Sequence, residues 1–204
     1  MKKIKVNEIS IGNDQPFVFI AGLNVLEDEK TIEDVISKCI SSTKKLGIPY
    51  IFKASYDKAN RSSVDSFRGP GVERGLQILS DLKQDYDVPV ISDIHTAHEA
   101  ELAAEVLDVM QIPAFLSRQT DLIEAACSTS IPINIKKGQF LAPSDMNNII
   151  QKCKHFNNED IMICERGTSF GYHNLVDRLI CLSVNVNSAP VPLKSNLDFK
   201  TLLA

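Results

Sequence analysis

The residues best suited to chemistry in this sequence are cations that end or follow short apolar runs. Arginine offers a planar fork for phosphate or carboxylate, whereas lysine supplies a compact point charge. Several cations held together repel one another, and a bound anion relieves that repulsion. The pattern therefore predicts a site for a ligand with two anionic ends, such as a phosphate and a carboxylate. The cations in question are Lys53, Lys58, Arg61, Lys136 and Arg166.

Polar residues beside these cations extend the predicted site. Asn60, Arg61 and Ser62 form a donor-rich segment that could hold a phosphate and sugar hydroxyls. Asp93 and His95 follow a third apolar run. An alternative role for His95 is that of a supporting residue, which hydrogen-bonds to the groups of the site without touching a ligand. For each lysine taken singly, the alternative is a solvated charge that flanks a strand.

The elements that must position these residues alternate along the chain. Six short apolar runs are separated by longer amphipathic stretches, which is the signature of a parallel α/β sheet. The strands are expected over 17–21, 50–53, 88–92, 109–112, 133–136 and 161–164, after a short segment over 6–11. The helices are expected over 30–46, 71–82, 98–106, 120–127 and 144–153, the last of them capped by Ser144.

Two architectures fit this alternation, an open doubly wound sheet and a (β/α)8 barrel. In both, ligands bind beyond the carboxyl ends of the strands, so the cations at the strand ends should converge on one face. The glycine-rich fingerprints GxGxxG and GxxxxGK[ST] do not occur in the sequence, which weakens a nucleotide-binding interpretation.

The composition is that of an ordinary folded chain. The 204 residues are 44% hydrophobic, and 22 Lys+Arg against 26 Asp+Glu give a net charge of −4. This balance excludes disorder and nucleic-acid binding through bulk charge, and no apolar run reaches the roughly 18 residues of a membrane span. The five cysteines form no CxxC pair, so buried free thiols are expected. Because the basic N-terminus lacks an apolar signal core, the cytoplasm is the expected location.

The order of the motifs resembles one enzyme family, 3-deoxy-D-manno-octulosonate 8-phosphate synthase, also called 2-dehydro-3-deoxyphosphooctonate aldolase. The similar segments are "FKASYDKANRSS", "FRGPG", "QIPAFLSRQTDL", "INIKKGQFLAP" and "ERGTSFGYHNLV". They lie in the family's order, and the resemblance runs from about Ile9 to Val176. It implies the (β/α)8 barrel version of the fold.

The resemblance also implies a reaction, the condensation of phosphoenolpyruvate with D-arabinose 5-phosphate and water. The products are 3-deoxy-D-manno-octulosonate 8-phosphate and phosphate, on the route to the lipopolysaccharide inner core. The enol phosphate is itself a carbon nucleophile, so neither a Schiff-base lysine nor a cofactor is expected. The protein would orient two small phosphorylated substrates, deliver a water and stabilise the charge that moves in the transition state.

The resemblance assigns the phosphoenolpyruvate site to residues near the carboxyl ends of the predicted strands. Those that resemble the ligands of its phosphate, or lie beside them, are Lys136, Arg166, Gln111 and Ala114. Those that resemble its carboxylate contacts, or lie near them, are Lys58, Ser55 and Lys53. The sugar phosphate is assigned to Asn60, Arg61 and Ser62.

Asn24 distinguishes two branches of this family. The metal-dependent branch has a metal-binding cysteine at this position, because thiolate is a good ligand for a divalent transition metal. An amide is a poor substitute, so "GLNVL" favours the metal-independent branch, in which Asn24 would position the sugar or the water. No metal is expected. The predicted catalytic residues are Asn24, Lys58, Asp93 and His95.

The last residues depart from the family. It would supply a seventh and an eighth strand after Val176, with a further His, Glu and Asp, but residues 177–204 contain no match. Alternation over 182–187 predicts one short strand, and prolines at 190 and 192 oppose a regular βα unit. We expect a barrel segment over 1–176 and a divergent tail over 177–204, with a frameshift, aberrant splice or gene-prediction error as its hypothetical origin. A chain of this form is expected to be weakly stable and to have little synthase activity.

Other functions stay open at this point. One is a Schiff-base aldolase that uses Lys53 or Lys136. Another is a binding or regulatory remnant that retains the phosphoenolpyruvate half-site without turnover. A third is a related condensation that uses erythrose 4-phosphate and would be carried out on the same kind of barrel, although the "KANRSS" loop resembles the octulosonate branch better. A homotetramer is implied by the family resemblance alone.

Overall fold

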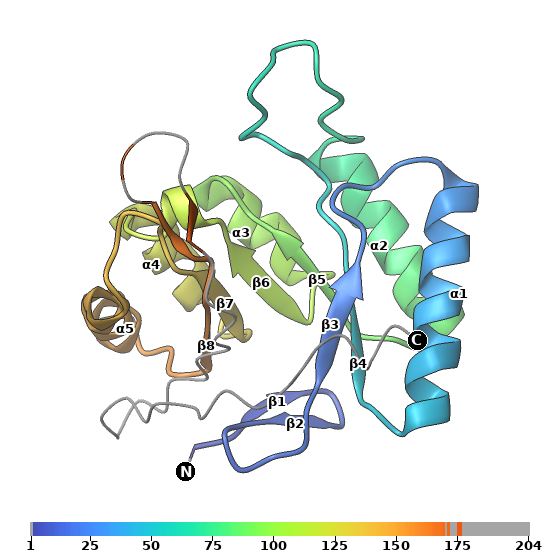
Figure 1. Cartoon of the computed structure of the whole chain (residues 1–204), viewed down its shortest axis with the longest axis horizontal. Helices are drawn as coiled ribbons and strands as arrows, with labels where there is room; N and C mark the ends of the chain where they lie inside the picture. Colours follow the sequence, from blue (N-terminus) through green and yellow to red (C-terminus); the bar gives the residue numbers. More distant parts are fainter. Residues whose placement is uncertain (1, 170, 172–174, 177–204) are drawn as a thin grey trace.

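The structure, a computed structural model, describes residues 2–169, 171 and 175–176. Six parallel strands form one sheet in the order β3-β4-β5-β6-β7-β8, which is also their order along the chain. The sheet is curled into part of a barrel, with the helices on its outside (Figure 1). The strands are β3 (Phe19–Gly22), β4 (Tyr50–Lys53), β5 (Val90–Asp93), β6 (Val109–Ile112), β7 (Ile133–Lys136) and β8 (Ile161–Cys164). The predicted α/β barrel class is therefore confirmed for this part of the chain.

Helices connect the strands as the periodicity predicts. They are α1 (Glu29–Leu46), α2 (Val72–Tyr86), α3 (Ala97–Ala104), α4 (Thr120–Ser128) and α5 (Met146–His155), with short 3-10 turns η1 (Ala114–Leu116) and η2 (Pro143–Asp145). Asp28 caps α1 by accepting from the backbone N of Thr31 at 3.0 Å. The predicted cap at Ser144 is wrong, because Ser144 lies inside η2 and Asp145 precedes α5.

Four of the six strands have the predicted bounds, and the other two begin two residues later than predicted. The first begins at Phe19 instead of residue 17, and the third begins at Val90 instead of residue 88, directly after Pro89. Proline has no backbone N–H to donate to a neighbouring strand, so regular pairing starts beyond it. Each of these two strands also ends one residue later than predicted, at Gly22 and at Asp93.

The two faces of the sheet have different roles. Residues paired across neighbouring strands point to the same side, so the register fixes the face of every strand residue. The outer face packs against the helices through Phe52, Val90, Met110, Ile112, Ile133, Ile135, Ile161 and Ile163. Near the carboxyl ends, the inner face carries Lys53, Asp93, Gln111, Asn134, Lys136 and Cys164. The polar side chains are thus gathered inside the curl of the sheet.

A hairpin closes the other end of the inner face. Residues 6–11, expected to be one short segment, instead belong to two antiparallel strands, β1 (Ile4–Val6) and β2 (Ile9–Ile11). Asn7 makes the turn possible with a φ of 50°, a left-handed conformation that asparagine tolerates. Ile4 and Val6 pack with an apolar layer of the inner face, formed by Ile51, Ile91, Val109 and Met162.

The remaining described elements are β9 (Thr168–Ser169) and β10 (Leu175–Val176), which pair antiparallel. Residues 177–204 lie outside the described residues, and so do the strand predicted over 182–187 and the predicted tail. Of the cysteines in the described part, Cys127 and Cys153 are buried as predicted, but Cys39 and Cys164 are only half-buried. No helix among the described residues combines the length and apolarity needed to cross a bilayer.

Candidate active site

Asp93 is the centre of a hydrogen-bonded cluster at the carboxyl ends of the strands. Its Oδ2 accepts from Ser55 Oγ at 2.5 Å and from Lys58 Nζ at 3.2 Å. Lys53 Nζ donates to Ser55 Oγ at 2.6 Å and lies 3.7 Å from the same Oδ2 atom. Ser55 and Asp93 are buried, and the side chains of Lys53 and Lys58 are 15% and 12% exposed. The structure therefore brings together residues that the sequence assigned to two separate strand ends.

The cluster continues across the next two strands. Gln111 in β6 donates from Nε2 to Oδ1 of Asp93, and Asn134 in β7 donates from Nδ2 to Oε1 of Gln111 at 2.9 Å. Lys136, the last residue of β7, is close enough for its charge to act on Asp93 and Lys53. Asn134 was not predicted as a site residue. Its polar side chain in the middle of an otherwise apolar run could have identified it. A polar group buried in a strand needs a hydrogen-bond partner, which points to other polar residues nearby.

Burial and neighbouring charges set the protonation of this cluster. Burial is the main reason that the pKa of Lys53 falls from 10.5 to about 7; Lys58 and Lys136 also lower it, and Asp93 opposes them. Burial alone would raise the pKa of Asp93, but the three lysines and the Ser55 hydroxyl hold it well below its ordinary value. Three lysines thus face one ionised carboxylate. An anionic ligand would balance the excess positive charge.

His95 lies against α3. Its Nδ1 is 3.1 Å from Oε2 of Glu99, and its ring packs edge-on to Tyr56 with the centroids 6.1 Å apart. Glu99 also accepts from the Tyr56 hydroxyl at 2.7 Å. This arrangement is the kind expected if His95 has a supporting role. Direct contact of His95 with a substrate stays a prediction.

The residues assigned to the sugar phosphate lie apart from the Asp93 cluster. They belong to the connection between β4 and α2, which projects beyond the carboxyl ends of the strands (Figure 1). Asn60, Arg61 and Ser62 are exposed there, and Arg61 Nε donates to the backbone oxygen of Phe67 at 3.1 Å. The structure gathers these three residues on one connection but does not bring them to the cluster.

The other predicted residues occupy loops at the same end of the sheet. Ala114 begins the η1 turn directly after β6 and is buried. Arg166 follows β8, Asn24 follows β3, and both are exposed. Each therefore lies beyond the carboxyl end of its strand, as the alternation of elements predicts. Their roles toward a ligand stay predictions.

Lys137 is a buried structural support of the loop after β8, which the sequence analysis did not predict. It is 1% exposed, and its Nζ donates to the backbone oxygen of Gly167 at 2.8 Å and to two carbonyls of its own loop at 3.1 Å each. Glu165 Oε1 lies 3.4 Å from Nζ and accepts from the backbone N of Arg166 at 2.9 Å. Lys137 therefore fixes the loop that carries Arg166. Lys136 ends the predicted strand and Lys137 follows it, and nothing in the pattern indicated which of the two would be buried.

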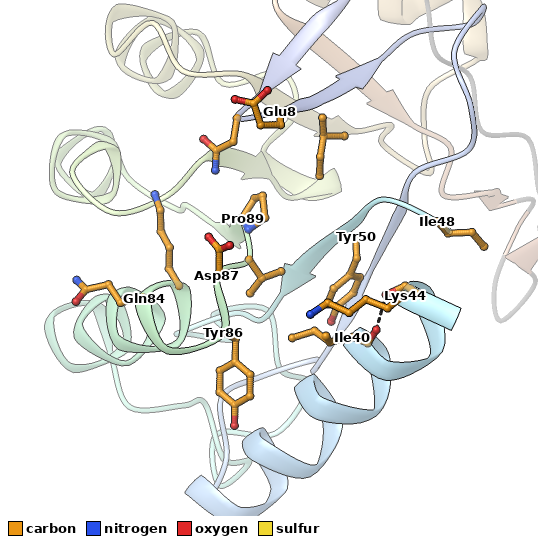
Figure 2. Close-up of a pocket in the computed structure, with 14 residues that line it drawn as sticks. Glu8, Ile40, Lys44, Ile48, Tyr50, Gln84, Tyr86, Asp87 and Pro89 are labelled. Carbon is orange, nitrogen blue, oxygen red and sulfur yellow. Dashed lines mark hydrogen bonds between the residues drawn. The ribbon is translucent and has the colours of Figure 1, made fainter. Parts of the chain in front are cut away.

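A cavity of about 520 Å³ lies at the opposite end of the sheet. It is bounded by the turn between β1 and β2, the C-terminal ends of α1 and α2, and the segment that enters β5 (Figure 2). Glu8, Lys44, Tyr50, Tyr86 and Asp87 are among its lining residues. None of the residues predicted for the site lines this cavity. It is therefore distinct from the Asp93 cluster.

The donor groups of the described residues are not arranged as a metal centre. Among residues 2–169, 171 and 175–176, no group of three or more His, Cys, Asp or Glu side chains is placed to hold a metal ion. Around Asp93, the potential ligands alternate with ammonium groups, which repel a cation. Metal independence of the complete site stays a prediction.

A curled parallel sheet with a polar cluster at its carboxyl ends defines an α/β barrel protein whose site suits an anionic ligand. A profile of the DAHP synthetase I family matches residues 1–192, and the chain belongs to this family.

Three individual relatives share one name within this family. The chain is 58% identical over 173 residues to a 2-dehydro-3-deoxyphosphooctonate aldolase of Marinobacter nauticus, covering 85% of this chain and 62% of the relative. Proteins with the same name from Hahella chejuensis and Pseudomonas paraeruginosa are each 54% identical over 175 residues, covering 86% of this chain and 62% of each relative. The resemblance carried by the motifs is confirmed. The chain spans about 62% of the length of these curated relatives.

Proposed function

We propose that this chain supplies the phosphoenolpyruvate site of an enzyme that condenses phosphoenolpyruvate with D-arabinose 5-phosphate and water. The single observation that carries the proposal is the gathering of Lys53, Lys58 and Lys136 around the buried Asp93. The names of the relatives support the same reaction. The products would be 3-deoxy-D-manno-octulosonate 8-phosphate and phosphate.

The cluster suits this reaction because phosphoenolpyruvate has two anionic ends. In the proposal, Lys136 and Arg166 bind the phosphate, beside Gln111 and Ala114. Lys58 and Ser55 bind the carboxylate. The half-buried ammonium groups would neutralise charge as the enol carbon attacks the sugar aldehyde and water adds to the resulting cationic centre. Release of phosphate completes the reaction, and every step proceeds without a covalent enzyme adduct.

The projecting connection between β4 and α2 would bind the second substrate. Hydrogen-bond donors for a sugar phosphate are available on the side chains of Asn60, Arg61 and Ser62. These side chains are exposed, so the substrate can reach them. Asn24 would orient the sugar or the attacking water, as in the metal-independent branch. Neither a metal nor an organic cofactor is proposed.

The test measures phosphate release from phosphoenolpyruvate with and without arabinose 5-phosphate, and with erythrose 4-phosphate in its place. Any release is expected only with the five-carbon sugar, and it should be slow, because a chain with the divergent tail over 177–204 is expected to have little synthase activity. Lys58→Ala should lower kcat/KM by roughly 100-fold, because it removes a cation aimed at the reacting charge. Lys45→Ala, an exposed lysine in the last turn of α1, is the matched control and should change nothing.

Two results would contradict the proposal. A borohydride-trapped adduct on Lys53 or Lys136 would indicate a Schiff-base aldolase instead. Calorimetric binding of phosphoenolpyruvate without any turnover would favour the binding-only alternative.

Further assignments accompany the proposed function. We propose a homotetramer from the family resemblance, and a cytoplasmic location because the basic N-terminus lacks an apolar signal core. Small phosphorylated substrates would be its ligands, with no nucleic-acid or membrane partner. The division into a barrel segment over 1–176 and a tail over 177–204 is likewise a proposal. Size-exclusion chromatography with light scattering would measure the assembly, and sequencing the transcript together with the intact protein mass would test the origin of the tail.

A further inference from the structure

Glu99 on α3 joins two loops at the carboxyl end of the sheet through a single carboxylate. Its Oε2 accepts from the Tyr56 hydroxyl at 2.7 Å, from the backbone N of His95 at 3.1 Å and from His95 Nδ1 at 3.1 Å. Tyr56 belongs to the loop that carries Lys58, and His95 follows Asp93 by two residues. The carboxylate is therefore connected to both sides of the Asp93 cluster.

Part of this arrangement is ordinary helix capping. The Thr96 hydroxyl accepts from the backbone N of Glu99 at 3.2 Å, and the Glu99 side chain reaches back toward the start of the helix. A capping role explains the contact with the backbone of His95. It does not explain why the same oxygen also receives the imidazole and the phenol, which lie on two different loops.

The chemistry of these contacts fixes where the imidazole proton lies. Burial opposes ionisation of Glu99, but the hydrogen bonds from His95 and Tyr56 hold its pKa below the ordinary value. An ionised carboxylate can only accept hydrogen bonds. The proton of neutral His95 must then be on Nδ1, which leaves the lone pair on Nε2. In the other tautomer, the Nδ1 lone pair would face the carboxylate and repel it.

We propose that Glu99 is a positioning residue that holds His95 as its Nδ1–H tautomer and thereby makes His95 Nε2 a hydrogen-bond acceptor for a substrate hydroxyl or for water. The same carboxylate anchors the base of the loop that carries Lys58, through Tyr56. The catalytic meaning of this inference rests on the proposed function, but the state of the imidazole does not.

The direct test is nitrogen-15 NMR of the imidazole rings of the full chain at a pH where His95 is neutral. His95→Gln identifies the His95 signals by their disappearance. In the unmodified protein, Nδ1 should have the shift of a protonated nitrogen and Nε2 that of an unprotonated one. The inference is overturned if Nε2 carries the proton, or if the two tautomers are equally populated.

Variants distinguish the proposed positioning role of Glu99 from a role in helix capping alone. Glu99→Gln presents an amide that can donate to Nδ1, so the Nε2–H tautomer should become populated. Tyr56→Phe removes only the competing phenol and should leave His95 in its Nδ1–H form, which keeps the test valid if Glu99→Gln folds poorly. Glu101→Gln, exposed on the same helix, is the matched control and should leave the spectrum unchanged. An unaltered His95 spectrum in folded Glu99→Gln would refute the role of the carboxylate.

Kinetics test the link to the reaction. Glu99→Gln should lower kcat by about tenfold or more, with little change in KM, because proton transfer through a positioned group contributes at least that much. If Glu99 only caps the helix, Glu99→Gln should lower the melting temperature without this selective loss of kcat at nearly constant KM. If neither the unmodified protein nor any variant shows turnover, while the tautomer of His95 shifts as expected in Glu99→Gln, the proposed function fails and the positioning role of Glu99 stands.

Discussion

Lys53 illustrates how strongly the surroundings of one side chain set its charge. In the sequence it is one lysine among many, and its ordinary pKa is 10.5. In the structure, burial beside Lys58 and Lys136 lowers that pKa to about 7, despite the attraction of Asp93. An anion bound at the cluster would favour the protonated form. Ligand binding and proton uptake by Lys53 should therefore be coupled.

The first prediction concerns the pH dependence of this coupling. Above pH 7, free Lys53 is increasingly neutral, so the affinity for phosphoenolpyruvate should fall with rising pH, by up to about tenfold per pH unit. Titration calorimetry between pH 7.5 and 9.5, in buffers with different ionisation enthalpies, measures both the affinity and the proton uptake. Lys53→Met should bind more weakly and lose this part of the pH dependence. An affinity independent of pH would contradict the prediction.

The same shift has an effect on stability whose sign can be stated. Between pH 7 and 10.5, the unfolded chain carries a proton on Lys53 that the folded protein lacks. The free energy of unfolding should therefore rise with pH across this window. Binding and stability would thus respond to pH in opposite directions, because the ligand requires the charged lysine and the empty fold favours the neutral one.

At the scale of elements, β4, α2 and the connection between them are held together around Tyr56. Gly75 on α2 lies so close that a Cβ atom there would be 2.2 Å from the Cβ of Tyr56. A Cβ on Gly69 would be 2.4 Å from the Tyr56 backbone oxygen, in a conformation with a φ of 116°. These two glycines let the start and the end of the connection pack side by side. They therefore determine where the loop carrying Lys58 begins.

The second prediction follows from this close packing. Gly75→Ala should destabilise the protein by about 2 kcal/mol, because the clash with the Tyr56 side chain outweighs the gain of roughly 1 kcal/mol in helix propensity. Urea unfolding followed by circular dichroism measures the change. Gln77→Ala on the exposed face of the same helix is the control and should alter stability by no more than about 0.5 kcal/mol. Equal stability of Gly75→Ala and the unmodified protein would show that α2 can move away at little cost.

At the scale of the whole molecule, the two ends of the inner sheet face are divided between stability and chemistry. The hairpin of β1 and β2 covers an apolar layer at the amino ends, where Val6 is 2% exposed. The carboxyl ends hold the charged cluster instead. Because the two layers are on the same strands, the apolar end supports the geometry of the charged end without touching a ligand.

The third prediction tests this division. Val6→Ala should lower the free energy of unfolding by about 2 kcal/mol, since it removes buried methyl groups and leaves a cavity. The affinity for phosphoenolpyruvate, measured by calorimetry well below the melting temperature, should stay within about twofold. Lys5→Ala, an exposed neighbour on the same strand, should leave both quantities unchanged. A large loss of affinity in folded Val6→Ala would refute the separation.

The sequence by itself determined the order of strands and helices and the residues at the strand ends. Apolar periodicity reports which side of an element is buried, and four strands therefore have the expected bounds. The motifs also identified the family. Lys53, Lys58 and Asp93 were recognisable as site residues because they are charged residues at or just beyond the end of an apolar run.

Only the tertiary structure decided which of these residues meet. Lys58 and Asp93 are 35 residues apart in the chain, and their contact depends on the register and curl of the sheet. The same geometry buried Lys137 instead of its neighbour, drew Asn134 into the cluster and connected Glu99 to His95, while it left Arg61 on an exposed loop. Local patterns encode burial residue by residue, whereas contacts between distant residues arise only when the elements pack against one another.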